Sequence, residues 1–318
     1  MTRVYINEVA SRDGFQNEAV FIPTDEKISF INTLSESGYA KIEVTSFTSP
    51  KAIPALKDAE VVMHEIHRNP DVVYTALVPN LRGAERAYDS QVQEFNLVMS
   101  LSETHNRANL RMRREGSFEQ LKTVIDTYQD KVSINVSFST VFGCPMEGDI
   151  AVSDVLAWIE KFSHIGVNKF TLCDTTGMAY PKQVQDLFAQ VKKHFPETDI
   201  TAHFHNTRGM ALANTMAALD EGIIRFDASL GGLGGCPYAP GASGNVSTED
   251  LVHMLALNGY DTGVNLSKIC ALAQQLPRLI QHDISSQVSK AGPRSRLYPA
   301  PDYIPVSYTH LTLPTTPY

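Results

Sequence analysis

Short apolar runs alternate with longer amphipathic segments along most of the chain. Between the runs, apolar residues recur at helical spacing, as in DEKISFINTLSESG and SDVLAWIEKFSHIG, and both of these segments end on a glycine. Ser153 at the start of the second segment is a candidate helix cap. The apolar runs are typical of buried β-strands and lie at residues 4–9, 41–47, 72–78, 95–101, 132–138, 169–175, 199–205 and 225–230.

Eight strand–helix units over about 260 residues have the size and rhythm of a closed barrel. We therefore predict an α/β protein, a (β/α)8 TIM barrel with additional C-terminal helices at 247–257 and 265–282, the first capped by Ser247 or Thr248. An open doubly wound sheet is the alternative, but eight even repeats favour closure. In a barrel, the reactive side chains belong at the carboxyl ends of the strands.

The predicted catalytic domain spans residues 1–284 and includes a glycine-rich lid loop at 231–245. Residues 285–318 are rich in Ser, Pro and Arg without a period, which predicts an irregular tail. The final stretch VSYTHLTLPTTPY resembles translated sequencing-adapter sequence, so these last residues are predicted to be non-native.

The composition and net charge of the chain argue against some classes of binding partner. The 318 residues carry a net charge of −8, which argues against nucleic acid or an anionic membrane surface as a partner. No apolar run approaches the roughly 20 residues that a membrane span needs. The four cysteines are scattered without a CxxC pair, and the first residues enter a strand pattern at once. These features predict a cytoplasmic protein, and we expect a homo-oligomer, a dimer or a tetramer.

The stretch ITAHFHNTRG holds two histidines at alternating positions of the predicted seventh strand. Side chains alternate across a strand, so His203 and His205 project to one face. Two core histidines would be the plain interpretation. Asp13, at the end of the first strand, adds an oxygen donor at the same rim. This N,N,O set suits a divalent cation with open positions, Mg²⁺ or Mn²⁺ in preference to zinc because no cysteine has ligand spacing.

Other charged residues occur at the same strand ends. Glu8, Arg12 and Asp13 follow one another in NEVASRDG, and Glu43 interrupts the apolar run KIEVTSF. Isolated buried charge is costly unless it is paired or metal-bound, so these groups are expected to contact one another or a cation. Asp174 ends the sixth strand, where a helix-capping role is the alternative.

The glycine-rich stretch GGLGGCPYAPGASGN, at 231–245, contains Cys236. It is either a flexible surface turn or a lid that carries a reactive thiol over the barrel mouth. It matches neither GxGxxG nor GxxxxGK, so a phosphate-binding role is weakly supported. Asn245 ends the loop and Glu249 follows it.

The elements SRDG, IEVTSF, FGCPMEG, AHFHNTRGMALAN and GLGGCPYAPGASGNVSTEDLVHML together resemble the 3-hydroxy-3-methylglutaryl-CoA lyase family, over residues 3–282. The resemblance implies a metal-dependent carbon–carbon lyase of leucine degradation, which cleaves an acyl-CoA substrate to acetyl-CoA and acetoacetate. It implies that Arg12 faces the thioester carbonyl and that Cys236 is a catalytic thiol. The implied metal ligands are Asp13, His203, His205 and Asn245, supported by Glu43, with Glu249 and Asp174 in the acid/base surroundings.

Several positions depart from the family pattern. Asn206 stands in HFHNT where the lyases usually have HCHDT, and Ser137 stands where many have a tyrosine. Met146 replaces the tyrosine of GCPYEG, and SPKAIPAL has Ala52 and Ala55 where KWVPQ has an aromatic residue and a glutamine. These substitutions fall on expected substrate-facing positions, Ser137 among them, so a citramalyl-CoA lyase or a related acyl-CoA lyase is an alternative.

Three further interpretations compete. A Claisen-type synthase generally has extra C-terminal regions and does not need the cysteine loop. A metal hydrolase of the amidohydrolase type carries its HxH on the first barrel strand, whereas here it is on the seventh. A barrel scaffold without catalysis would not explain why so many reactive residues fall at strand ends.

Overall fold

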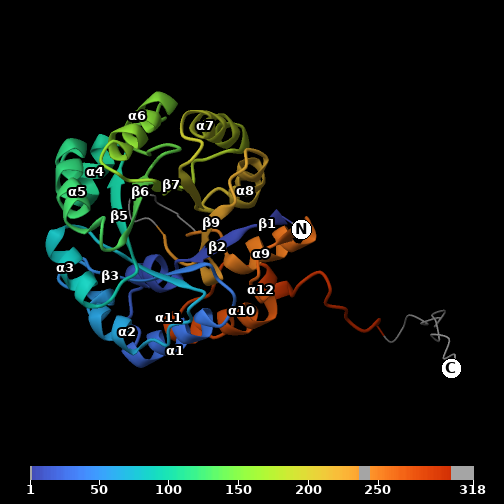
Figure 1. The fold of residues 1–318 in the computed structure, drawn as a ribbon. Coiled ribbons are helices and arrows are strands. Elements are labelled where there is room, and N and C mark those ends of the chain that lie inside the picture. The colour runs from blue at the N-terminus through green and yellow to red at the C-terminus, as the bar shows by residue number, and fades with distance from the viewer. Residues whose placement is uncertain (1, 236–243, 302–318) are drawn as a thin grey trace, which may run out of the picture.

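Eight parallel strands close into a barrel in the computed structural model, which describes residues 2–235 and 244–301. The strands pair in sequence order, and the last closes onto the first (Figure 1). They are β2 (Tyr5–Glu8), β3 (Lys41–Ser46), β4 (Val73–Leu77), β5 (Glu94–Ser100), β6 (Ser133–Ser139), β7 (Lys169–Asp174), β8 (Asp199–Phe204) and β9 (Arg225–Ala228). Each of these strands overlaps a predicted apolar run, and the (β/α)8 TIM barrel is confirmed.

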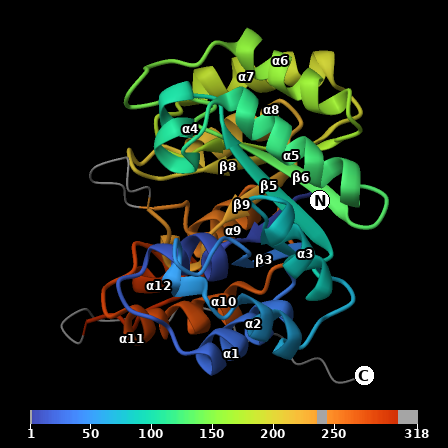
Figure 2. The ribbon, with the colours of Figure 1, turned by 90° about the vertical axis from the view of Figure 1, so that its left-hand side faces the viewer.

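Helices surround the barrel on all sides (Figures 1 and 2). The ring consists of α1 (Thr24–Ser35), α2 (Ala59–Glu65), α3 (Leu81–Asp89), α4 (Glu103–Leu110), α5 (Arg114–Tyr128), α6 (Val152–Ser163), α7 (Pro181–His194) and α8 (Ala211–Asp220). Short helical turns follow several strands: η1 (Ala10–Gly14), η2 (Phe15–Asn17), η3 (Pro54–Leu56) and η4 (Leu230–Gly232).

The C-terminal helices continue the ring, and α10 packs against α1 (Figure 1). They are α9 (Thr248–Leu257), α10 (Leu266–Ala273), α11 (Leu276–Ile280) and α12 (Val288–Ala291), and β1 (Thr2–Arg3) pairs in parallel with β10 (Tyr260–Asp261). Ser247 caps α9 by accepting from the Asp250 amide, as predicted. Among the helices that the structure describes within 2–235 and 244–301, none is long and apolar enough to cross a membrane.

Strand alternation separates an apolar outer layer from a polar lumen. Outward residues pack on the helices, as where Phe138 of β6 lies with its ring centroid 5.5 Å from that of Phe162 of α6. Inward residues at the amino-terminal half of the lumen are mostly hydrogen-bonding groups, including Asn7, Glu43, Thr75, Glu94, Asn96, Asn135, Thr171 and Asp227. The apolar outer face of the strands therefore packs against the helices, and the lumen holds charged side chains and their hydrogen-bonding partners.

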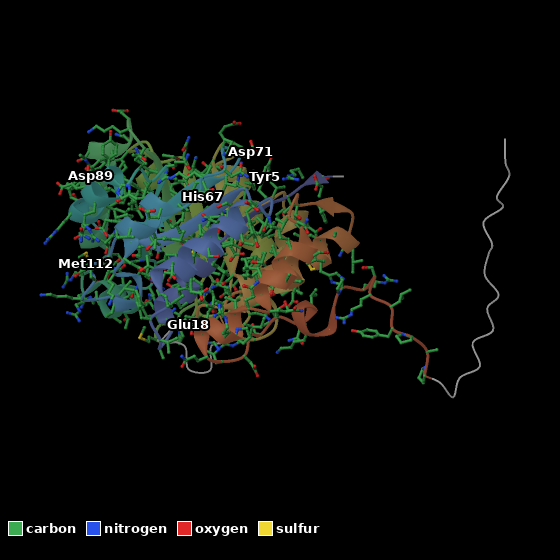
Figure 3. The ribbon with its side chains drawn as sticks, turned by 90° about the horizontal axis from the view of Figure 1, so that it is seen from below. Tyr5, Glu18, His67, Asp71, Asp89 and Met112 are labelled. Carbon is green, nitrogen blue, oxygen red and sulfur yellow. The ribbon has the colours of Figure 1, made fainter. Side chains whose placement is uncertain are left out.

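The two ends of the barrel are distinct. Tyr5 and Asp71, which begin or precede strands, lie at one end of the molecule in Figure 3. Glu18 and Met112, which follow the carboxyl ends of β2 and β5, lie toward the opposite end. The second end is where the predicted reactive residues gather.

Three local details differ from the sequence predictions. The N-cap of α6 is Ala151 rather than Ser153, which lies inside the helix and does not cap it. The β1–β10 pair was not predicted, because two-residue strands leave no periodic signal. The packed part of the chain extends past residue 284, since the amides of Gln287 and Val288 donate to Asp250. The domain division at 284 stays a prediction, and residues 302–318 lie outside the described part.

A buried ion cluster fixes the amino-terminal floor of the lumen. Glu94 of β5 is paired with Lys41 of β3 and, at 3.0 Å, with Lys169 of β7. Burial by itself would raise the pKa of Glu94, but the charges and hydrogen bonds of the two lysines lower it below its usual value.

We expect Glu94→Ala to lower the free energy of unfolding by about 3 kcal/mol, because it leaves two lysines without their buried partner. Since the folded pKa of Glu94 is lowered, its contribution is present above the ordinary carboxyl pKa and is lost as pH falls through the folded value. Denaturant unfolding at several pH values measures both effects. Glu115→Ala is the control, because Glu115 pairs with Lys161 while its side chain is 69% exposed, and should change stability by less than about 1 kcal/mol. Equal losses in the two variants would contradict this account.

Candidate functional site

Three side chains meet at the carboxyl end of the barrel as potential metal ligands. Asp13 of η1, His203 of β8 and His205, directly after β8, each offer one ligand atom, and these atoms lie within 4.8 Å of one another. His203 and His205 are buried, and Asp13 is buried or half-buried. The structure thus brings together the N,N,O set predicted from sequence, and this donor set suits a divalent cation with open coordination positions.

Hydrogen bonds around the triad are consistent with bound metal. His203 Nδ1 lies 3.1 Å from an Asp227 oxygen, which leaves Nε2 to face the cluster, and His205 Nε2 lies 3.9 Å from Asp13 Oδ2. Asn245 Nδ2 donates to Asp13 Oδ2 at 2.7 Å. Its Oδ1 is buried and has no hydrogen-bond partner among the described residues. A buried amide oxygen without a partner beside three ligands is what a cation site requires.

The electrostatics distinguish the three ligands. Burial would raise the pKa of Asp13, but the Arg12 charge and the two histidines lower it, so the carboxylate stays ionised. Burial lowers the pKa of His205 to about 3, with a further contribution from His203. Burial also acts to lower the pKa of His203, but the hydrogen bond and charge of Asp227 outweigh it and raise that pKa.

Arg12 is held between two carboxylates. Its Nε donates to Glu43 Oε2 at 2.6 Å and its Nη1 to Asp13 Oδ1 at 2.6 Å. Glu43 also accepts from Asn96 at 2.7 Å, so the mid-strand carboxylate finds the cationic partner that the sequence analysis expected. The pKa of Arg12 is raised by these carboxylates despite its burial, so the guanidinium keeps its charge.

A cavity of about 440 Å³ opens beside the triad. Its wall contains Ser137, whose hydroxyl donates to Asn96 at 2.6 Å, and Ala52 near the mouth. Other side chains and backbone atoms that line the cavity belong to Arg12, Asp13, His105, Cys173, His203, His205, Asp227 and Gly235. One hollow therefore holds the candidate metal ligands, a fixed cation and an uncharged polar wall.

Asp174 and Glu249 belong to the rim but are not among the cavity-lining residues. Asp174 follows Cys173 on β7, so alternation turns it outward, where it accepts from the amides of Met178 and Ala179. Burial raises the pKa of Asp174 to about 7. Glu249 accepts from the Gly231 amide and from the hydroxyls of Ser247 and Ser289, and burial raises its pKa as well.

Glu8 also turns away from Arg12 and Asp13, although the three are close in sequence. Its Oε1 accepts from the amides of Ala10 and Leu230, and its Oε2 accepts from Thr248. Burial raises the pKa of Glu8 to about 7. The expected contact of Glu8 with the Arg12–Asp13 pair was therefore wrong, because Glu8 faces the outer side of the barrel.

Cys236 and the loop residues up to 243 lie outside the described part of the chain. The residues on either side are placed against the site. Gly235 lines the cavity, and its carbonyl accepts from Asn17 at 2.9 Å. Gly234 has φ +95°, and a Cβ there would lie 2.8 Å from Asp13 Oδ2, so only glycine lets the backbone approach the triad this closely.

Two groups of site residues were missed by the sequence analysis. Asp227 of β9 lines the cavity and contacts His203, and its signal was the polar alternation of Arg225 and Asp227 within RFDASL. His105 and Cys173 also line the cavity, and neither stood out because His105 belongs to no motif that the sequence analysis identified and Cys173 lies in an apolar run. Asn206 is outside the cavity lining: its Oδ1 accepts from the Ala211 amide.

Comparison with known proteins places this geometry in a family. The HMGL-like family model matches residues 3–276. The chain is 46% identical to hydroxymethylglutaryl-CoA lyase YngG of Bacillus subtilis over 273 residues, which cover 86% of this chain and 91% of the relative. It is 39% identical to the human mitochondrial hydroxymethylglutaryl-CoA lyase over 290 residues, covering 91% and 89% of the two chains.

Comparison with solved structures points to the same family. An HMG-CoA lyase from Acinetobacter baumannii, in complex with coenzyme A and 3-methylmalate, matches with a TM-score of 0.91 and 47% identity, covering 94% of this chain and 98% of that one. The carboxyl transferase domain of Rhizobium etli pyruvate carboxylase matches with a TM-score of 0.70 at 15% identity over 90% of this chain and 50% of that one, which shows a shared fold alone. The resemblance inferred from sequence motifs is confirmed: the chain belongs to the HMGL-like family.

Proposed function

We propose that this chain is a divalent-metal-dependent lyase that breaks the C2–C3 bond of a 3-hydroxy-3-methylacyl-CoA. The substrate is 3-hydroxy-3-methylglutaryl-CoA, cleaved to acetyl-CoA and acetoacetate, or a close analogue such as citramalyl-CoA. The observation that carries the proposal is the meeting of Asp13, His203, His205 and Arg12 in one cavity of a barrel of this family. The named activities of the relatives support it.

The family depends on a divalent metal, and we assign Mg²⁺ or Mn²⁺ to this site. Asp13, His203 and His205 would hold the ion, with the Asn245 oxygen as a fourth donor. When bound, the ion polarises the C3 hydroxyl and lowers its pKa, which eases loss of the proton before the carbon–carbon bond breaks. The donors are two imidazoles, a carboxylate and an amide oxygen, with no thiolate, and the two oxygen donors favour these ions over zinc.

Arg12 supplies fixed positive charge for the thioester oxygen, where negative charge develops as the acetyl-CoA enolate forms. Because Glu43 and Asp13 already orient the guanidinium, no reorganisation is needed during the reaction. Preorganised charge of this kind lowers a barrier by roughly 3 kcal/mol. Ser137 and Asn96 form the neutral wall that contacts the rest of the acyl group.

Cys236 is assigned as the thiol that returns a proton to the enolate carbon. In the sequence it directly follows Gly235, which lines the cavity. The acid/base roles that the resemblance implies for Asp174 and Glu249 stay predictions. Their contacts with backbone amides and hydroxyls favour a role in holding the rim in place.

A cytoplasmic location and a dimeric or tetrameric assembly also stay predictions. The three cysteines in the described part, Cys144, Cys173 and Cys270, are free thiols, which supports a reducing compartment.

Incubation of the purified protein with Mg²⁺ and a panel of 3-hydroxyacyl-CoA thioesters tests the function directly. We expect acetyl-CoA from 3-hydroxy-3-methylglutaryl-CoA or citramalyl-CoA, and loss of product when EDTA removes the metal. Chromatography of the CoA esters measures the product, and the ratio of kcat/KM values identifies the substrate. No acetyl-CoA from any member of the panel would overturn the proposal.

His205→Ala should abolish metal-dependent cleavage, since it removes one of three clustered ligands from the site. Titration calorimetry with Mn²⁺ should show at least tenfold weaker binding, in line with the loss of a coordinating group. His194→Ala is the matched control, because His194 is exposed on α7, away from the cavity lining, and its Nδ1 lies 2.8 Å from the Gln190 carbonyl. Equal metal affinity in His205→Ala and His194→Ala would remove His205 from the ligand set.

Cys236→Ser should leave Mn²⁺ affinity unchanged and lower kcat by about 100-fold, the range of general acid–base effects. The hydroxyl is a far weaker acid than the thiol at the same position. Steady-state kinetics measure kcat, and Cys270→Ser, at a half-buried position outside the cavity lining, is the control. Unchanged turnover in Cys236→Ser would retire the thiol from the mechanism.

A further inference from the structure

We propose that Asp227 is a positioning residue that fixes the orientation and tautomer of the metal-binding His203, and that Asn7 holds Asp227 for this purpose. The inference rests on the metal site proposed above. It gives a function to two contacts between neighbouring strands: Asp227 of β9 with His203 of β8, and Asp227 with Asn7 of β2, where the barrel closes.

Strand register puts the three residues in one row. Asp227 of β9 is the register partner of Asn7 on β2 and also of His203 on β8. Residues in register on neighbouring strands point to the same face of the sheet, here the lumen. The row therefore spans three adjacent strands, and no loop is needed to build it.

Both oxygens of Asp227 are engaged, each by a different strand. Asn7 Nδ2 donates to Oδ1 at 2.8 Å, and His203 Nδ1 lies 3.1 Å from Oδ2. An ionised carboxylate can only accept, so the Nδ1 of His203 carries the proton. The Nε2 lone pair is then free for the cluster formed with Asp13 and His205.

The second histidine has no such support. His205 Nδ1 is buried and has no hydrogen-bond partner among the described residues. The two imidazoles are therefore unequal: Nδ1 of His203 contacts a carboxylate, whereas Nδ1 of His205 has no such partner among the described residues. Metal-ligating histidines commonly donate their second N–H to a carboxylate or carbonyl, and loss of that partner weakens metal binding by 10–100-fold.

The same pair of strands provides an internal control. Asp199 of β8 and Arg225 of β9 form an ion pair at 2.6 Å at the opposite end of the strands, with Asp199 40% exposed. Asp199→Asn removes one carboxylate charge between β8 and β9, as Asp227→Asn does. Asp199 lies four residues before His203 on β8, at the other end of the strand, so it reports the effect of the charge loss on the strands alone.

Titration calorimetry of the metal-free full chain with Mn²⁺, without substrate, measures the effect. We expect Asp227→Asn to raise the Kd by 10–100-fold and Asp199→Asn to change it by less than twofold. A Kd for Asp227→Asn within twofold of the wild type would overturn the proposal. If the wild-type chain itself does not bind Mn²⁺, the metal site and the proposed function fail together, which is a different result.

The double variant Asn7→Asp with Asp227→Asn tests whether the effect on metal binding comes from the position of the charge or from packing. It also provides a second test if Asp227→Asn alone does not fold. It keeps the two side chains nearly isosteric and the total charge unchanged, but moves the carboxylate one strand away from His203. We expect its Kd to stay raised like that of Asp227→Asn, and recovery of wild-type affinity would overturn the role of the Asp227 charge.

The protonation of His203 can also be measured in the wild-type protein, with one variant used only to assign the signal. In the metal-free protein with ¹⁵N-labelled histidine, we expect His203 to show protonated Nδ1 at neutral pH, assigned by its absence in His203→Gln. A neutral ring protonated at Nε2 alone would overturn the proposal. A purely structural contact would not fix which nitrogen carries the proton.

Discussion

The structure depends on the register in which β9 closes the barrel onto β2. Tyr5 to Glu8 pair residue by residue with Arg225 to Ala228, and this alignment puts Asn7, Asp227 and His203 in one row. A slip of β9 by one residue would turn Asp227 to the helix-packed face and break its alignment with Asn7 and His203. The apolar residues that alternate with them, such as Ile6, Phe226 and Ala202, oppose such a slip because they are fully or almost fully buried. Hydrophobic burial outside the barrel thus sets the polar geometry inside it.

The protein interior shows how buried charge is tolerated. Glu94 has two lysines as partners and Glu43 has Arg12 and Asn96, while Glu8, outside the lumen, has two amides and a hydroxyl. Removal of one member of such a group would leave its partners buried without their counter-charge or hydrogen bond. At the carboxyl end, Asn245 Oδ1 and His205 Nδ1 are buried without a hydrogen-bond partner among the described residues.

Much of the fold could be predicted from sequence because the strands are long apolar runs and the helices are periodic. The triad could be predicted as well, since alternation puts His203 and His205 on one face. The orientation of Asp174 follows from the same rule, which puts Cys173 inward and Asp174 outward. Glu8 and Glu249 could not be placed from sequence, since their partners Leu230, Thr248 and Gly231 come from distant segments. Asp227 was overlooked because a single acidic residue in a short strand has no motif around it.

The buried carboxylate of Glu8 connects three segments next to the site. One of its oxygens binds the amide of Ala10, where η1 begins, and the amide of Leu230, where η4 begins, while its other oxygen binds Thr248 at the start of α9. The segment that presents Arg12 and Asp13, the segment that leads into the glycine-rich loop and the helix that follows the loop therefore share one anchor. A side chain that does not line the cavity thus ties the segment carrying the candidate ligand carboxylate to both ends of the glycine-rich loop.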